Sequence, residues 1–212
     1  MTHNEISDKS KVMGAFGGKR GILDSGLPSL IFLIAFNISH NLRTSLYGAV
    51  ITSAVLTLIR LIRKDTLQHV LSGFFGVAFC ALLARKTGHA ADFYLPGLII
   101  NLVYGLIYSI LNLVGLPLLG LMLGPILGEN LAWRKVPERK RVYIRAGWLW
   151  VAMFFSRLAV QYPLYKSGNI NALGTARLVM GYPLFILAAW GSWLFIKSVP
   201  SVKVPVSEPT EQ

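Results

Sequence analysis

Residues 157–165 read Arg-Leu-Ala-Val-Gln-Tyr-Pro-Leu-Tyr, and residues 177–185 read Arg-Leu-Val-Met-Gly-Tyr-Pro-Leu-Phe. Each copy of this near-repeat opens on an arginine, Arg157 or Arg177, within or at the edge of an apolar run long enough to span a bilayer. No Asp or Glu stands between Glu138 and Glu208. Because a guanidinium is costly in lipid, each arginine is expected to face a protein interior or a watery cavity. The end of the chain is therefore predicted to be a membrane hairpin that carries a polar site.

The composition is that of a membrane protein. Of the 212 residues, 54% are hydrophobic and only 14% are charged, whereas a soluble domain carries about 25% charged residues. So much apolar surface needs lipid as its solvent. The net charge of +12 could suggest nucleic acid. The basic residues, however, cluster between hydrophobic runs, as the positive-inside rule requires, so nucleic acid is not expected as a partner.

Hydrophobic runs fall at residues 27–40, 44–62, 67–84, 94–114, 143–164 and 173–196. Most approach the roughly 20 residues that cross a hydrocarbon core. The sequence predicts an all-α, polytopic integral membrane protein of about six transmembrane helices in a single domain, residues 14–198. Residues 1–13 and 199–212 are expected to be disordered cytoplasmic ends, and no cleavable signal peptide is expected.

The distribution of Lys and Arg predicts the orientation. With a cytoplasmic N-terminus and six crossings, 15 of the 21 basic residues lie inside, 4 lie outside, and Arg157 and Arg177 lie in the spans. This asymmetry places both termini in the cytoplasm of a bacterial inner membrane. A seventh crossing at residues 115–128 would move the basic residues from Arg134 to Arg145 outside. That segment is therefore predicted to be re-entrant or interfacial on the cytoplasmic side.

Residues 17–28 read GGKRGILDSGLP and precede the first apolar run. The spacing is not that of a phosphate-binding P-loop. One interpretation is a juxtamembrane basic pair, Lys19 and Arg20, followed by a helix that Asp24 or Ser25 caps and in which Pro28 suits the first turn. The other is an anion site for a lipid phosphate or a charged solute, with Lys19, Arg20 and the glycine amides as donors. Positive-inside placement favours the first interpretation.

Gly120, Gly124 and Gly128 recur every four residues, with Pro117 and Pro125 between them. Glycines at this spacing line one face of a helix and admit a close neighbour. The prolines favour a break instead, and a broken helix beside a cavity can bind solute through freed carbonyls. The sequence leaves both alternatives open, a packing face or a binding site.

The two arginines differ in where their side chains can reach. Arg157 lies inside its span, and its Cβ leans further into the membrane, which makes it the better functional candidate. Arg177 begins its span and leans toward the outer surface, so we expect it to act as an anchor. Asp92, in an outer loop with His89, is the nearest acidic partner by topology. A buried arginine that only ties the bundle together is the alternative.

Other chemistry is not expected. The four histidines lack metal-ligand spacing, and neither a nucleophile elbow nor a zinc-protease motif occurs. We expect no catalytic residues, no metal and no cofactor. The basic stretch from Trp133 to Arg145 is expected to set topology and to contact anionic lipid headgroups.

Several of these segments together resemble a known family: the stretch at 17–28, residues 71–88, the run PGLIINLVYGLIYS, Trp133-Arg134-Lys135, the first repeat and the run ALGTARLVMGYPL. They are similar to the actinobacterial membrane family called domain of unknown function 3159, over residues 14–197. That resemblance implies a multi-pass inner-membrane protein of unknown activity. The order of a Pro-Leu-Leu-Gly segment, Trp-Arg and an aromatic span also resembles the intracellular septation protein A family, which is linked to envelope synthesis and division.

Three functions follow from these patterns. The first is a non-enzymatic membrane protein, transporter-like or lipid-binding, that holds a small anionic ligand among Arg157, Arg177, Lys19, Arg20, Asp24 and the three glycines. The second is a scaffold of envelope or septation machinery, with homo-oligomers or envelope proteins as partners. The third, an enzyme acting on lipid, has the weakest support because no catalytic constellation is visible.

Overall fold

The computed structural model describes residues 18–63 and 67–202, and side chains from residues 27–63 and 73–202. Helices and turns make up this part of the chain, with no strand in it, as predicted. The chain forms two compact units, which we call unit 1 (Met1–Pro96 and Pro163–Leu178) and unit 2 (Gly97–Tyr162 and Val179–Gln212). The end predicted to be disordered at residues 1–13 falls outside the described residues. Of the other predicted disordered end, residues 199–212, the part from residue 203 onward also falls outside them.

Unit 1 is built on three neighbouring helices. These are α2 (Gly18–Ser39), α3 (Leu42–Ile62) and α4 (Leu67–Thr87), joined by the 3-10 turn η1 (Ala90–Phe93), the end of α7 and α8 (Ile170–Val179). Helix α3 packs against both α2 and α4, and η1 packs against α4. The core uses small residues such as Ala49 and Ala84 beside Phe32 and Leu173. Small side chains let these helices approach closely.

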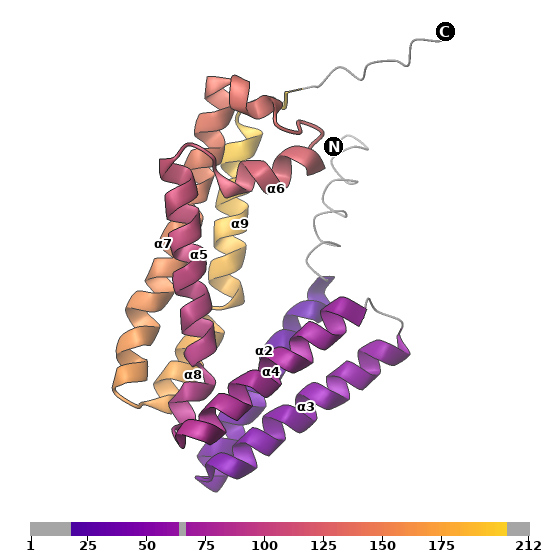
Figure 1. The fold of residues 1–212 in the computed structure, drawn as a ribbon, viewed down its shortest axis with the longest axis vertical. Helices are drawn as coiled ribbons and strands as arrows, with labels where there is room; N and C mark the ends of the chain where they lie inside the picture. The colour runs from indigo at the N-terminus through magenta and orange to yellow at the C-terminus, as the bar shows by residue number, and fades with distance from the viewer. Residues whose placement is uncertain (1–17, 64–66, 203–212) are drawn as a thin grey trace. The chain divides into compact units, whose positions relative to one another are not determined.

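Unit 2 is an aromatic bundle. It contains most of α5 (Leu95–Leu113), α6 (Leu118–Ile126), η2 (Ala132–Lys135), most of α7 (Pro137–Lys166), and α9 (Tyr182–Lys197). Trp150 lies at its centre. Its ring stacks on Tyr108 at 5.9 Å and meets Phe185 edge-on at 5.0 Å, while Nε1 donates to Ser192 Oγ at 2.9 Å. The ring contacts and this hydrogen bond join α5, α7 and α9, which run side by side in Figure 1.

Three helical segments are long and apolar enough to cross a membrane: Leu42–Ile62, Leu95–Leu113 and Ile170–Lys197. Leu27–Ser39 is apolar but shorter. Their outward faces carry large aliphatic side chains, for example Ile51 and Leu58 on α3 and Ile100 and Ile110 on α5. Apolar side chains exposed in this number fit contact with lipid. The arrangement of six spans stays a prediction.

The two copies of the near-repeat fold differently. In the first, α7 continues through Pro163 to Lys166. In the second, α8 ends at Val179, and α9 begins at Tyr182 with Pro183 in its first turn. The two copies differ at four of their nine positions, and at one of these Gly181 replaces Gln161. Glycine weakens a helix, and a following proline then starts a new one readily. The predicted last span is thus a broken helix.

Helix α2 begins earlier than the sequence predicts. It starts at Gly18 and contains Pro28, so the expected helix start, with Asp24 or Ser25 as the cap and Pro28 in the first turn, is wrong. Lys19, Arg20 and Asp24 lie on its first two turns. The placement of their side chains lies outside what the structure describes.

The glycine-rich segment is a short helix that covers a tryptophan. Helix α6 spans only nine residues, and the buried Trp133 lies against Gly120 and Gly124. A Cβ on Gly120 would lie 2.8 Å from the indole ring, and one on Gly124 would collide with the carbonyl of Asn130. Gly128, at φ 72°, ends the segment in a left-handed turn. Gly120 and Gly124 therefore form a packing face, one of the two alternatives that the sequence left open.

This packing predicts that the same substitution, Gly to Ala, changes the stability of the protein very differently at two positions. Gly124→Ala forces the α6 backbone away from Asn130 and should cost about 1–3 kcal/mol of stability. Gly73→Ala, on α4, meets nothing within 4 Å and should be neutral or slightly stabilising. Thermal unfolding of both variants in the same detergent measures the difference. Equal melting temperatures would contradict the packing role of Gly124.

Candidate functional site

The turn η1 is the centre of unit 1. All four of its residues are buried. Phe93 stacks on Phe32 of α2 at 4.2 Å, and Tyr94, the next residue, meets the same ring edge-on at 5.7 Å. These aromatic contacts fix η1 against α2. The polar groups of η1 and its flanking residues are thereby held in place.

Asp92 places a carboxylate inside unit 1. Its Oδ1 accepts a hydrogen bond of 2.6 Å from Tyr165 Oη at the end of α7, and its Oδ2 lies 4.0 Å from Nδ1 of the exposed His89. A buried carboxylate needs such partners because its desolvation is costly. Asp92 thus ties η1 to the last turn of α7. Arg157, its partner predicted from topology, belongs to unit 2, so the pairing stays a prediction.

Arg177 is held by Tyr94. Its Nη1 donates to the Tyr94 carbonyl at 3.2 Å, and its guanidinium lies 5.5 Å from the centre of the Tyr94 ring. Gly174, one turn earlier on the same face of α8, makes room for this ring, since a Cβ there would lie 3.0 Å from Tyr94 Oη. The sequence predicted an anchor that reaches the outer surface. The structure instead turns the guanidinium of Arg177 onto the residue that follows η1.

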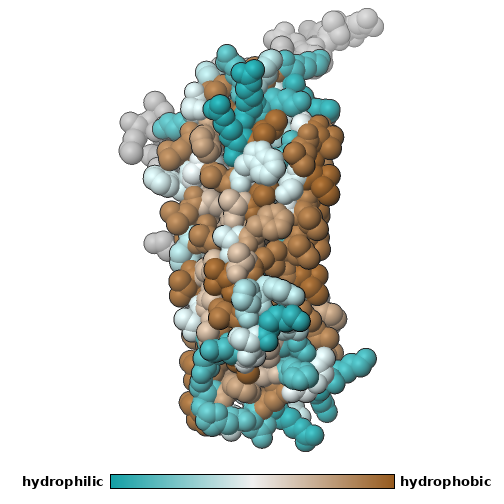
Figure 2. Space-filling model, turned by 90° about the vertical axis from the view of Figure 1, so that its left-hand side faces the viewer, coloured by the Kyte–Doolittle hydropathy of each residue, from teal (hydrophilic) through white to brown (hydrophobic). Residues whose placement is uncertain are grey.

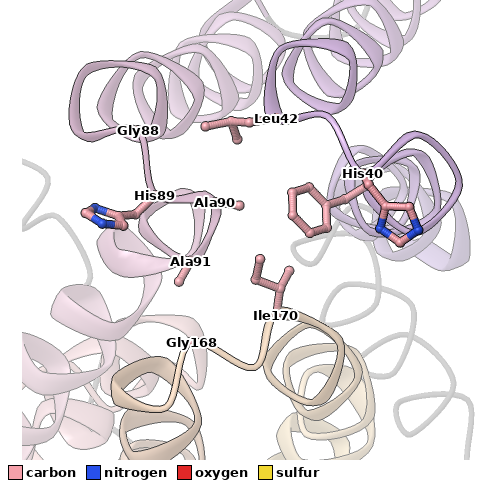
Figure 3. Close-up of a pocket in the computed structure, with 9 residues that line it drawn as sticks. His40, Leu42, Gly88, His89, Ala90, Ala91, Gly168 and Ile170 are labelled. Atoms are coloured by element: carbon pink, nitrogen blue, oxygen red, sulfur yellow. The ribbon is translucent and has the colours of Figure 1, made fainter.

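A pocket of about 350 Å³ lies beside η1. Its lining comes from the ends of α2, α3 and α4, from η1 and from the α7–α8 turn: Phe36, His40, Leu42, Gly88, His89, Ala90, Ala91, Gly168 and Ile170. In Figure 3 the side chains of Leu42, Ala90 and Ile170 face a common space, while the rings of His40 and His89 lie on opposite sides and point outward. The lining is thus mostly apolar, with a histidine on each side of it.

Arg157 lies on the inward face of α7. It follows Trp150 by seven residues and precedes Gln161 by four, so all three share one side of the helix. Trp150 and Gln161 are buried and Arg157 is partly buried. Of the predicted site residues, the structure places Asp92 in η1 and Arg177 against Tyr94, two residues further along the chain. It leaves Arg157 and the three glycines in the other unit.

Sequence analysis missed a buried ion pair in unit 2. Arg139, 2% exposed, forms an ion pair with Glu129, which is fully buried. The guanidinium Nε donates to Glu129 Oε2 at 3.2 Å, and Tyr143 Oη donates to the same oxygen at 3.0 Å. Nη2 lies against Glu129 Oε1 and 3.5 Å from Tyr143 Oη. Nη1 donates to the carbonyls of Ile196 and Val199, each at 2.6 Å. These contacts engage all three nitrogens of the guanidinium.

The helical period could have revealed this pair. Six basic residues lie between Arg134 and Arg145, but only Arg139 shares a helix face with Tyr143, Ala146 and Trp150, at spacings of four, seven and eleven residues. A cation on an otherwise apolar, buried helix face needs a carboxylate partner, because an unpaired buried charge is costly. Glu129, between the glycine-rich segment and the basic stretch, is the nearest inward candidate. The basic stretch is therefore not uniformly a topology signal, because one of its members is structural.

The comparisons with known proteins place the chain in a family. A family model described as a protein of unknown function (DUF3159) matches residues 16–203. The chain belongs to this family. The resemblance in the sequence motifs to domain of unknown function 3159 is thereby confirmed. No curated protein and no solved structure matches the chain. The match covers η1, the pocket and the Arg139 network of this DUF3159 protein alike.

The Arg139 network predicts a strong dependence of folding on one member of the basic stretch. Arg139→Ala leaves the buried Glu129 without its cation and should destabilise the DUF3159 protein by about 3–5 kcal/mol. Arg141→Ala, two residues on and exposed, should change stability by less than about 0.5 kcal/mol. Thermal unfolding in detergent compares the two variants. The double variant Arg139→Leu, Glu129→Leu should recover much of the loss, because no unpaired charge remains.

Proposed function

We propose that this protein is a non-enzymatic, multi-pass protein of a bacterial inner membrane that binds a small anionic ligand in unit 1. The observation that carries the proposal is Arg177. Its guanidinium is held by one carbonyl and one aromatic ring, and in the part of the chain that the structure describes it forms no ion pair with a carboxylate. An intramembrane cation without a fixed counter-charge marks a ligand or ion pathway.

The contrast with Arg139 supports this choice. Arg139 has a carboxylate partner that neutralises its charge, and all three nitrogens of its guanidinium contact protein acceptors. For Arg177, the structure gives one carbonyl acceptor, the Tyr94 ring and the nearby thiol of Cys80. None of these neutralises the positive charge. An anionic group could do so, with the bidentate geometry that a guanidinium offers to carboxylate and phosphate.

The surroundings of the pocket also favour an anion. Exposed Arg43 follows the lining residue Leu42. Exposed Lys86 and Lys166 each stand two residues before a lining glycine, Gly88 or Gly168. The only carboxylate of the pocket region within the described chain is Asp92, which is engaged by Tyr165. Cations grouped at the mouth of a low-dielectric pocket attract and concentrate anions. In the orientation we propose, this end of unit 1 faces the outside.

A scaffold is the second candidate. Gly73 and Gly76 lie one turn apart on α4, both are exposed, and a Cβ on either would meet nothing within 4 Å. Such an open glycine face admits the helix of a partner or of a second copy. This observation favours a structural role in envelope or septation machinery, in line with the resemblance to the septation protein A family. We also propose the actinobacterial origin that the other resemblance implies.

Native mass spectrometry of protein released from its own membrane tests ligand binding. We expect a discrete bound mass on the wild type that is lost from Arg177→Gln and kept by Arg63→Gln, which removes the same charge from an exposed position at the other end of α3. Arg157→Ala, measured beside them, tests the other arginine of the near-repeat. Clean wild-type protein, or a mass that survives Arg177→Gln, would contradict the proposal and favour the scaffold.

Cysteine labelling tests the orientation. In a Cys80→Ser background, Arg141→Cys should react with a membrane-impermeant maleimide only from the cytoplasmic side. Lys86→Cys should react only from outside, because six crossings place the two residues on opposite faces. Labelling of residue 141 from outside would show that the glycine-rich segment crosses the membrane after all.

A further inference from the structure

One face of α7 in unit 2 carries an ordered series of exposed side chains. Arg141, Arg145 and Trp148 begin the series, and Ala152, Phe155, Ser156 and Ala159 continue it. All seven are exposed, and at 100° per residue they fall within one narrow stripe on the side opposite Arg139 and Trp150. Figure 2 shows teal side chains at the top and at the bottom of this view and predominantly brown ones between them.

From this order we propose that the stripe is a binding site for one anionic phospholipid of the cytoplasmic leaflet. The phosphate would lie between Arg141 and Arg145, and an acyl chain would follow the stripe along α7. This inference rests on the membrane placement proposed above. It is independent of Arg177 and of the pocket in unit 1, because every residue of the stripe belongs to unit 2.

The chemistry of the stripe changes in the order in which a phospholipid changes. Two guanidiniums come first, one turn apart, and a pair of them can hold a phosphate through several charge-assisted hydrogen bonds. Trp148 follows at 41% exposure, at the level where tryptophan ends the headgroup region. Small exposed side chains follow at positions 152, 156 and 159, beside the exposed Phe155. We call this strip the acyl track, because small side chains leave room for a flexible acyl chain to lie against the helix.

The length of the stripe fits one leaflet. Eleven residues separate Trp148 from Ala159, which at 1.5 Å per residue is about 16 Å of helix. Half of a hydrocarbon core about 30 Å thick is about 15 Å. The stripe thus ends near the bilayer midplane, where an acyl chain also ends.

The charge of the stripe is positive even with its acidic neighbour counted. Glu138 is exposed and precedes Arg141 by three residues, so it can offset part of one guanidinium. Arg145 lies a further turn along and has no carboxylate within four residues in the sequence. Arg139, the other arginine of this part of α7, is already neutralised by Glu129. The two exposed arginines therefore keep a net attraction for a phosphate.

A lipid titration followed by native mass spectrometry tests the site. The probes are phosphatidylglycerol and phosphatidylcholine with the same acyl chains, added to delipidated protein in detergent. We expect the wild type to bind one phosphatidylglycerol at least tenfold more tightly than phosphatidylcholine. The variant Arg141→Gln, Arg145→Gln should lose at least tenfold in affinity for phosphatidylglycerol. The variant Arg134→Gln, Lys135→Gln, which removes the same net charge from exposed positions outside the stripe, should stay within threefold of the wild type.

Two further variants test the acyl track without changing charge. Ala152→Phe or Ala159→Phe fills the track from an exposed position, and each should weaken phosphatidylglycerol binding severalfold while circular dichroism and melting temperature stay at wild-type values. Equal losses of phosphatidylglycerol affinity in the two charge variants would show general electrostatic attraction and not a defined site, and would contradict the proposal. Wild-type affinity in both Phe variants, or equal affinity for phosphatidylcholine, would overturn the proposal. Arg177→Gln should bind phosphatidylglycerol normally, so that failure of the unit 1 proposal and failure of this one give different results.

Discussion

Arg139 places a full positive charge where water is excluded, and unit 2 is arranged around that charge. Glu129 supplies the opposite charge from the turn after α6, Tyr143 bridges the two, and the carbonyls of Ile196 and Val199 accept the remaining donors. The last carbonyls of a helix lack intrahelical partners, so Arg139 also satisfies the end of α9. One side chain therefore determines where α6 must turn, which face of α7 points inward and where α9 stops.

The requirement that buried charges be neutralised separates the arginines of this protein by role. In unit 2 the protein itself neutralises Arg139. In unit 1 Asp92 of η1 is satisfied by Tyr165, while Arg177 contacts Tyr94, just after η1, without a carboxylate in the described chain. The arrangement around Arg139 is a complete ion pair with a structural role. The arrangement around Arg177 leaves a positive charge that a ligand can complete, which is why the functional proposal is placed in unit 1.

Glycine and proline decide where helices break and approach in this protein. Gly181 in place of Gln161 divides the last apolar segment into α8 and α9, although Arg, Leu, Tyr and Pro recur in both copies of the repeat. Gly174 admits Tyr94 beneath α8, and Gly124 admits the backbone of Asn130 beside α6. The close approaches at Gly174 and Gly124 depend on the absence of a Cβ. At the break between α8 and α9, the low helix propensity of Gly181 and the following Pro183 favour the start of a new helix.

The sequence by itself determined the helical class, the membrane character and the family, because hydrophobic runs and motif order are local properties that survive without coordinates. It also identified Arg177 and Asp92 as candidates, since charged residues within or beside hydrophobic runs can be recognised from the sequence alone. Only the tertiary structure decided which charges are paired. The helical period marks Arg139 as inward-facing, but its pairing with Glu129 and that of Arg177 with Tyr94, 83 residues away, depend on how the helices pack. The division into two units and the pocket beside η1 likewise arise from contacts between segments distant in the chain.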